Sequence, residues 1–374
     1  MRIGVPKEIK DQEYRVGLVP ASVRELAHHG HAVTVETNAG HAIGLDDADY
    51  ADAGATIAGD AETVFAEAEL IVKVKEPQRR ECAMLRQGQV LFTYLHLAAD
   101  ADQTARLVES GVTAIGYETV TDADGRLPLL APMSEVAGRM AIQAGAHCLE
   151  KAQGGRGLLL GGVPGTAAAR VVILGGGVVG TNSARMAMGV EARVTVLDKS
   201  LARLQQLDLQ FGPILNTIYA TVDAIETLVT GADLVVGAVL VPGSDAPKLI
   251  TRAMVAAMRR GTVIVDVAID QGGCAETSRP TTHTEPTYTV DDVVHYCVTN
   301  MPGAVARTST FALNNATLPY VVSLADEGWR QALTGNSHFL DGLNVHAGRI
   351  THPAVAEALG LDAIPAAEAL GAGP

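Results

Sequence analysis

The chain has 374 residues, of which 48% are hydrophobic and only 4% aromatic, and its formal net charge is −14. This length is enough for about two domains. The acidic balance argues against nucleic acid and anionic membrane surfaces as partners.

The N-terminal part alternates short apolar runs with helix-like segments, a pattern typical of parallel sheets with crossover helices. The N-terminus carries charged residues where a signal peptide would have an apolar core. The cysteines form no C-x-x-C pair, so we expect a cytoplasmic protein without a metal site or a disulfide framework. Strands are predicted at Arg2–Val5, Ala32–Glu36, Leu70–Val74, Val90–Leu95 and Val112–Tyr117, and helices at Ala21–His29, Asp60–Ala68 and Asp100–Ser110.

Pro128 and Pro132 interrupt this pattern, and Ser134 is a suitable N-cap for a helix predicted over Glu135–Lys151. Further strands are predicted near Thr217–Tyr219, Asp233–Val239, Thr262–Ala268 and Val293–Val298, and helices at Asn314–Asp326 and Pro353–Leu359. We therefore predict an α/β fold of two Rossmann-like, doubly wound parallel-sheet domains. The first covers 1–131, the second is inserted over 132–303, and 304–374 is a helical return to the first.

A glycine fingerprint, Gly175-x-Gly177-x-x-Gly180, lies in the inserted domain and includes Val178 and Val179. It follows the β-branched run from Val171 and precedes a helix-like segment. In such a motif the first glycine permits a tight turn, the second lets the backbone approach a pyrophosphate, and the third lets helix and strand pack closely. The helix N-terminus offers N–H groups to the phosphates. The pattern predicts dinucleotide binding, with a purely structural turn as the alternative.

Asp198 ends the next apolar run, where a carboxylate can accept hydrogen bonds from ribose hydroxyls. A carboxylate there would also repel a 2′-phosphate, which favours NAD over NADP. Lys199 and Arg203 lie close by in the sequence and weaken that preference. We therefore interpret the inserted domain as an NAD-binding domain.

Polar residues follow the predicted strands at the ends where ligands bind in open α/β sheets. Lys75 and His96 occupy these positions in the first domain, and Asp270 and Asn300 in the second. A histidine titrates near neutrality and can move protons. If Lys75, His96, Asp270 and Asn300 converge on one cleft, they would form a catalytic site.

Each of these candidates has a structural alternative. His96 is one of eleven histidines, and a lone histidine is often structural. Lys73 alternates with Lys75 along a strand, and we interpret it as a solvated edge residue. Arg15 lies in a charged loop, where a surface salt bridge is the alternative, and Asp270 could be a helix cap.

Stretches over nearly the whole chain resemble the alanine dehydrogenases. Met1–Lys10 and Glu13–Pro20 resemble the start of this family and of the related transhydrogenase α subunit. Stretches similar to alanine dehydrogenases specifically are Val74–Pro77, Leu91–Leu97, Ala131–Gly138, Gly237–Gly243, Asp266–Gly273 and Asn300–Pro302. The resemblance implies a cytoplasmic homohexamer that converts L-alanine reversibly to pyruvate and ammonium with NAD.

The same resemblance implies roles for individual residues. Arg15 would hold the substrate carboxylate, Lys75 would contact the carboxylate and keto oxygen, and His96 would be the principal acid/base. Asp270 would assist proton transfer, while Tyr94, Met133 and Asn300 would line the substrate pocket. Residues along the cofactor would be Ser134, Asp198, Arg203, Ala220, Val239, Leu240, Val267, Asp270, Asn300 and Met301. Arg203 and Ala220 depart from the lysine and the small hydroxyl residue common in the family.

Two other functions fit parts of the pattern. One is an NAD(H)-binding subunit that passes hydride to a partner, as in transhydrogenases. The other is a dehydrogenase for a different amino acid, such as an opine or saccharopine dehydrogenase. The presence of Arg15, Lys75 and His96 together favours an amino-acid enzyme, and no membrane-spanning run is expected after the second domain.

Overall fold

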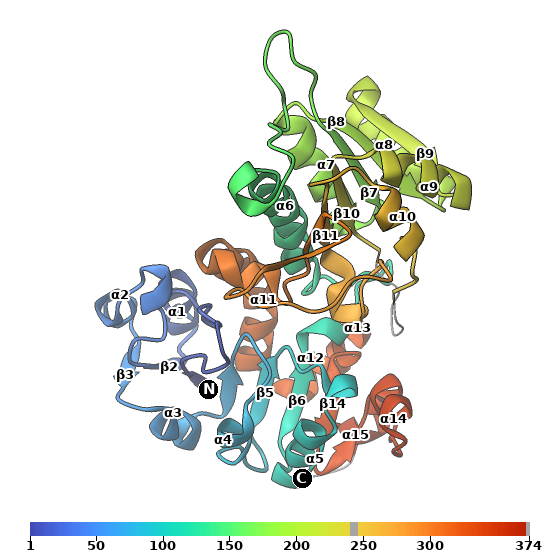
Figure 1. The fold of residues 1–374 in the computed structure, drawn as a ribbon. Helices are drawn as coiled ribbons and strands as arrows, with labels where there is room; N and C mark the ends of the chain where they lie inside the picture. Colours follow the sequence, from blue (N-terminus) through green and yellow to red (C-terminus); the bar gives the residue numbers. More distant parts are fainter. Residues whose placement is uncertain (240–245, 372–374) are drawn as a thin grey trace. The chain divides into compact units, whose positions relative to one another are not determined.

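The computed structural model describes residues 1–239 and 246–371, which form two compact units (Figure 1). Unit 1 comprises Met1–Pro132 and Val305–Pro374, and unit 2 comprises Met133–Ala304. Each unit is built around its own sheet. Among the described residues, no helix is long and apolar enough to cross a membrane.

The sheet of unit 1 has eight strands among the described residues, in the order β15-β14-β6-β5-β4-β1-β2-β3. The strands from β1 to β6 are parallel and follow the doubly wound order 3-2-1-4-5-6. β14 and β15 extend one edge in antiparallel pairing. The strands are β1 (Arg2–Val5), β2 (Ala32–Glu36), β3 (Thr56–Ala58), β4 (Leu70–Val72), β5 (Val90–Thr93), β6 (Thr113–Gly116), β14 (Leu343–His346) and β15 (Arg349–Ile350).

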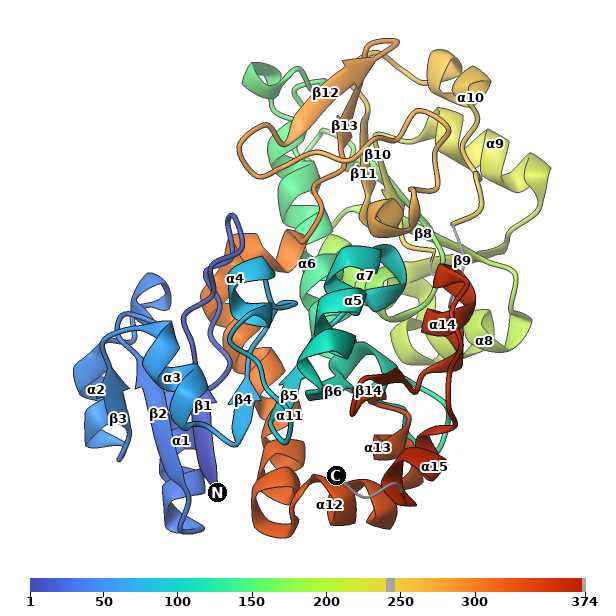
Figure 2. The ribbon, with the colours of Figure 1, turned by 90° about the horizontal axis from the view of Figure 1, so that it is seen from below.

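The C-terminal segment was predicted to be helical, and this prediction is wrong for β14 and β15. These strands are short, and Ala347 and Gly348 reverse the chain between them with φ values of 46° and 80°. Figure 2 shows the red β14 beside the teal β6 of the same unit. The helices of unit 1 are α1 (Pro20–His28), α2 (Asp47–Asp52), α3 (Ala61–Glu67), α4 (Arg79–Cys82), α5 (Ala101–Ser110), α11 (Ala306–Glu327), α12 (Trp329–Gly335), α13 (Ser337–Leu340), α14 (Pro353–Leu359) and α15 (Ala366–Gly371).

The sheet of unit 2 has seven strands among the described residues, in the order β12-β13-β11-β10-β7-β8-β9. Its parallel part again follows the doubly wound order, and the antiparallel β12, which was not predicted, covers one edge. The strands are β7 (Arg170–Leu174), β8 (Arg193–Asp198), β9 (Leu215–Tyr219), β10 (Leu234–Gly237), β11 (Val263–Asp266), β12 (Thr287–Val290) and β13 (Val293–Tyr296).

The sequence of strand β7 is a continuous apolar run because both faces of the strand are buried. Val171 and Ile173 are buried in the core on one face of the sheet, and Val172 and Leu174 in the core on the other face. Helices cover both faces, so both sets of alternating side chains must be apolar. Besides the long helix α6 (Ala131–Cys148), the helices of unit 2 are α7 (Val178–Gly189), α8 (Leu201–Phe211), α9 (Val222–Gly231) and α10 (Arg252–Ala257).

The long helix α6 (Ala131–Cys148) begins earlier than predicted. Ser134 therefore lies within its first turn and is not the N-cap that the sequence suggested. Pro132 is compatible with this start, because a first-turn residue needs no N–H for the helix. Met133 and Ser134 are consequently residues of a helix rather than of the loop before it.

Candidate active site

The predicted substrate residues of unit 1 lie at the carboxyl ends of its central strands. The segment after β1 carries Arg15, the segment after β4 carries Lys75, and the segment after β5 carries Tyr94 and His96. The doubly wound order reverses between β1 and β4, and ligands bind at such a switch point in α/β sheets. The structure thus places these residues at one edge of one sheet.

Arg15 is buried, with 2% of its surface exposed. The Glu13 carboxylate accepts hydrogen bonds from Arg15 Nε and Nη2, each at 2.6 Å. Burial by itself would lower the pKa of Arg15, but the hydrogen bonds to Glu13 outweigh it and raise the pKa. Arg15 is therefore a fixed cation rather than part of a surface salt bridge, and Glu13, which sequence reasoning missed, sets its orientation.

Lys75 is a half-buried cation close to this arginine. Burial lowers the pKa of Lys75, and repulsion from Arg15 and Lys10 acts in the same direction against the attraction of Glu76. A lysine in such surroundings gives up its proton more readily than one in water. The side chain can therefore both attract an anion and exchange a proton.

His96 is paired with a carboxylate that the sequence analysis did not single out. Its Nδ1 atom lies 3.6 Å from Glu76 Oε2, an ion-pair separation, and 44% of the His96 side chain is exposed. Burial would raise the pKa of Glu76, but His96, Lys75 and Lys10 outweigh burial and hold that pKa well below its usual range. A carboxylate at Nδ1 favours a proton on that nitrogen and leaves Nε2 for proton transfer.

The prediction that Lys73 is a solvated edge residue is wrong. Strand β4 ends at Val72, so the alternation of faces does not continue to Lys73. Its side chain is fully buried, and Nζ contacts Glu8 Oε2 at 3.2 Å and Glu81 Oε1 at 2.5 Å. Glu8 also accepts a hydrogen bond from Val74 N–H at 2.7 Å. This cluster anchors the turn that carries Lys75.

Tyr94 is buried, and its hydroxyl donates to the Leu129 carbonyl at 2.6 Å. Its ring packs edge-on against Tyr117, with the centroids 5.1 Å apart, and lies 5.7 Å from the ring of His96. Burial raises the pKa of Tyr94. The residue therefore forms an aromatic wall beside His96 and remains a neutral phenol at physiological pH.

The fingerprint loop of unit 2 has the geometry of a phosphate cradle. Gly175 has a φ of 100°, and a Cβ there would lie 2.7 Å from the Ala238 carbonyl oxygen. A Cβ on Gly180 would lie 1.9 Å from the Gly175 carbonyl oxygen, so the close approach of helix and loop requires glycine. A Cβ on Gly177 would meet nothing within 4 Å. The backbone of Gly177 therefore has room beside it for a pyrophosphate.

Helix α7 begins directly after Gly177, and Val178 and Val179 form its first turn. The carboxylate of Asp198, at the end of β8, accepts from Gly176 N–H at 2.7 Å and from Ser200 N–H at 2.8 Å. Arg203 Nε donates to the Gly176 carbonyl at 2.6 Å. The acid and the arginine are thus both tied to the glycine loop. Ala220 is half-buried after β9.

The remaining predicted residues of unit 2 follow its other strands. Val239 is half-buried after β10, Leu240 lies outside the described residues, and Val267 opens the 3₁₀ helix η6 (Val267–Gln271), which contains the exposed Asp270. The cap role considered for Asp270 belongs to Asp266, whose Oδ1 accepts from Ala268 N–H at 3.1 Å. Asn300 has a left-handed φ of 57°. Met301 is buried and opens η7 (Met301–Val305).

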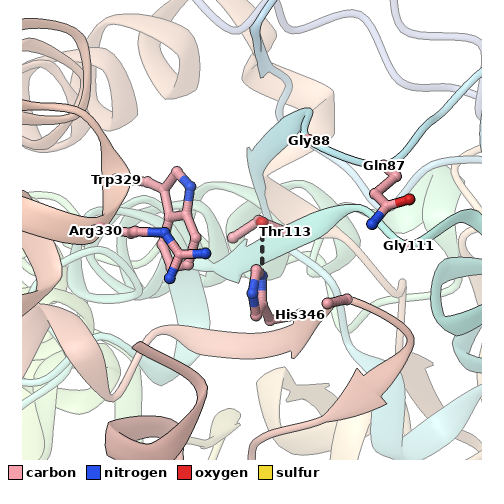
Figure 3. A pocket seen from close by; sticks show the side chains of 8 residues that line it. Gln87, Gly88, Gly111, Thr113, Trp329, Arg330 and His346 are labelled. Carbon is pink, nitrogen blue, oxygen red and sulfur yellow. Dashed lines mark hydrogen bonds between the residues drawn. The ribbon is translucent and has the colours of Figure 1, made fainter. Parts of the chain in front are cut away.

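A separate hollow of about 360 Å³ lies at the opposite end of the unit 1 strands (Figure 3). Gln87 and Gly88 precede β5, so this hollow is at the amino ends of strands whose carboxyl ends carry the candidate site. Trp329 and Arg330 face it from α12, and His346 Nδ1 lies 3.0 Å from Thr113 Oγ1. None of its lining residues belongs to the predicted site.

The two doubly wound sheets and the fingerprint loop with its carboxylate define a dinucleotide-binding α/β protein, a class that includes the NAD(H)-dependent oxidoreductases. Family models agree with this class. Residues 4–137 match the model described as "Alanine dehydrogenase/PNT, N-terminal domain", and residues 141–353 match the corresponding C-terminal domain. The chain belongs to the alanine dehydrogenase/PNT family, which confirms the resemblance found in the sequence.

Individual relatives cover the chain almost completely. It is 62% identical to the alanine dehydrogenase of Halomonas elongata over 99% of this chain and 100% of the relative. It is 53% identical to that of Mycolicibacterium smegmatis, with the same coverage. A solved L-alanine dehydrogenase superposes with a TM-score of 0.94 at 54% identity, covering 96% and 99% of the two chains. A transhydrogenase from Sinorhizobium meliloti, at 23% identity and a TM-score of 0.81 over 95% and 100%, shares the fold. These matches confirm the predicted fold class.

Proposed function

We propose that this chain catalyses the reversible, NAD-dependent oxidative deamination of L-alanine to pyruvate and ammonium. The observation that carries the proposal is the group of Arg15, Lys75 and His96 at one sheet edge, in a chain 62% identical to an alanine dehydrogenase over its full length. In this proposal 1–131 and 304–374 form the substrate domain, and 132–303 form the NAD-binding domain.

The chemistry suits these side chains. NAD, when bound, accepts a hydride from Cα of alanine. The resulting iminium adds water, and the carbinolamine loses ammonia to give pyruvate. His96 takes and returns the protons of these steps, with Glu76 orienting its ring. Arg15 offers a planar fork to the substrate carboxylate, and Lys75 stabilises negative charge on the oxygen that becomes the keto group.

The unit 2 residues have a parallel set of proposed roles. The fingerprint backbone from Gly175 to Gly180 would hold the pyrophosphate, and Asp198 the adenosine ribose. Asp270 would assist proton transfer and place the amino group. Tyr94, Met133 and Asn300 would line the substrate pocket, and Ser134, Arg203, Ala220, Val239, Leu240, Val267 and Met301 would lie along the cofactor.

Assembly and location are also part of the proposal. The family resemblance supports a homohexamer in the cytoplasm that serves L-alanine catabolism. Size-exclusion chromatography with light scattering would test the assembly. A monomer at micromolar concentration would contradict it.

The direct test of the activity is an initial-rate assay of purified protein. Alanine, serine, glycine and 2-oxo acids are supplied in turn with NAD or NADP, and NADH absorbance is followed. We expect the highest kcat/KM with L-alanine and NAD, and with pyruvate, ammonium and NADH in reverse. Activity confined to another amino acid would overturn the proposal.

The variant His96→Ala tests the proton-transfer role in the same assay. We expect turnover to fall by at least about 10²-fold, because general acid–base catalysis contributes this much. NADH affinity should stay within about twofold, since the fingerprint belongs to the other unit. Turnover close to that of the wild type would remove His96 from the mechanism.

A further inference from the structure

The backbone of His96 adopts a conformation that a non-glycine residue rarely adopts. Its φ is 52° and its ψ is 37°, in the left-handed region. Left-handed residues that carry a Cβ are strained, and such strain persists only when the surrounding structure holds it in place. The turn that carries His96 must therefore have strong partners.

Glu118 is such a partner. Its Oε1 atom accepts from His96 N–H at 2.6 Å and from Leu95 N–H at 3.1 Å, and its Oε2 atom lies 3.2 Å from the same Leu95 nitrogen. Hydrogen bonds to a carboxylate are stronger than those between neutral groups. One side chain thus holds the two consecutive N–H groups that enter the left-handed turn.

Two carbonyl groups of the same turn accept hydrogen bonds from side chains of helix α5. Gln103 Nε2 donates to the Leu95 carbonyl at 2.9 Å, and Thr104 Oγ1 donates to the Leu97 carbonyl at 3.1 Å. Both residues belong to α5. The turn is therefore fixed on its N–H side by Glu118 and on its carbonyl side by α5.

The fold places Glu118 where this contact is possible. It lies in the 3₁₀ helix η3 (Tyr117–Thr119), directly after β6 and therefore at the same sheet edge as the end of β5. A Cβ on Gly116 would come within 3.3 Å of Glu118 Oε2 and 2.9 Å of Asn344 Nδ2. Glycine at that position leaves room for the carboxylate.

We propose that Glu118 is a positioning residue for the reaction, acting through the main chain of His96. Glu76 Oε2 lies 3.6 Å from Nδ1 of the imidazole, and Glu118 accepts from the peptide N–H of the same residue. One carboxylate thus faces the ring of the acid/base, and a second holds its main chain. The inference rests on the proposed function, because the proposed function assigns the proton transfers to His96.

Two substitutions of Glu118 distinguish its role in positioning the main chain from an effect of its charge alone. Glu118→Gln keeps an oxygen acceptor of the same reach and removes the charge, whereas Glu118→Asp keeps the charge and withdraws both oxygens by one methylene. We expect kcat to fall at least about tenfold in Glu118→Asp, since small misplacements of a catalytic group are costly. In Glu118→Gln we expect kcat within about fivefold of the wild type, from the weaker neutral hydrogen bonds.

A matched control exists in the same unit. Asn38 is also left-handed, with a φ of 62°, and its N–H donates to Asp47 Oδ1 at 2.7 Å. It follows β2, which is separated from β5 by β1 and β4. Asp47→Glu disturbs the same kind of contact away from His96, so we expect an unchanged kcat with a lowered unfolding temperature.

The assay measures kcat and KM for alanine, NADH affinity by fluorescence titration, and unfolding temperature for all variants. Wild-type kcat in Glu118→Asp, or an equal loss in Glu118→Gln and Glu118→Asp, would overturn the inference. So would an equal loss of kcat in Asp47→Glu. Wild-type protein without alanine-dependent turnover would instead contradict the proposed function, which separates the two failures.

Discussion

At the residue scale, carboxylates set the orientation of the groups beside them. Glu13 holds the guanidinium of Arg15 through two hydrogen bonds of 2.6 Å, and Glu76 faces Nδ1 of His96. Asp198 does the same for the fingerprint loop, because it accepts from Gly176 N–H. The Arg15 guanidinium and the fingerprint loop are therefore fixed before a ligand arrives, which lowers the cost of ordering them on binding.

Asp198 provides a prediction about nucleotide choice. Replacing it with alanine removes the negative charge that would repel a 2′-phosphate. We expect Asp198→Ala to weaken NADH binding about tenfold, from the loss of hydrogen bonds with the ribose and with Gly176. NADPH binding should weaken less. The Kd ratio of the two nucleotides, measured by fluorescence titration, checks this. An unchanged ratio would show that Asp198 does not discriminate between them.

At the scale of elements, the sequence was most informative where both faces of a strand are buried. The β-branched runs of β1, β7 and β11 were predicted within a few residues, because parallel strands between helix layers have no polar face. β3 has three residues and β15 has two, and unlike the equally short but fully buried β4 they form no apolar run. β12 and β14 lie near sheet edges and depend on pairing with distant strands, which local sequence does not reveal.

The candidate site was predictable to a similar degree. Lys75 and His96 follow strands, and the strand-end rule singled them out from the sequence as candidates. The same rule could have found Glu118, which directly follows the strand predicted over Val112–Tyr117. The burial of Lys73 was not predictable from its neighbours, because it depends on Glu81 and Glu8, which are 8 and 65 residues away in the chain. Long-range charge pairing determines whether such a residue is buried.

The fingerprint turn gives a matched pair of substitutions at this scale. A Cβ on Gly177 meets open space, whereas a Cβ on Gly180 would clash with the Gly175 carbonyl. We expect Gly177→Ala to fold with wild-type stability but to bind NADH at least about tenfold more weakly, since the methyl group obstructs the pyrophosphate. We expect Gly180→Ala to lose both stability and binding. Differential scanning calorimetry and NADH titration separate the two. Wild-type affinity in Gly177→Ala would contradict the cradle assignment.

At the scale of the whole molecule, folding stability depends on a buried ion cluster within unit 1. Burial raises the pKa of Glu8 from 4.5 to about 7, with Glu81 raising it further and Lys73 opposing. The folded protein therefore retains a proton on Glu8 up to a higher pH than the unfolded chain does. The contribution of this group to stability is complete below pH 4.5 and is lost as the pH rises through 7.

The variant Glu8→Gln tests this pH dependence. Glutamine resembles the protonated side chain and cannot ionise, so its contribution should not vary with pH. We expect the free energy of unfolding of the wild type, relative to Glu8→Gln, to fall by up to about 3 kcal/mol between pH 5 and pH 8. Urea unfolding at several pH values measures this difference. A difference that is constant with pH, or that grows in favour of the wild type, would contradict the assignment.

The proposed hydride transfer from Cα of alanine to NAD can be followed with L-[2-²H]alanine. Purified protein is incubated with this substrate and NAD, and pyruvate, ammonium and the isotopic content of NADH are measured together. We expect one deuterium in the reduced nicotinamide for each pyruvate and each ammonium formed. NADH without deuterium, or NADH formed without pyruvate, would contradict it.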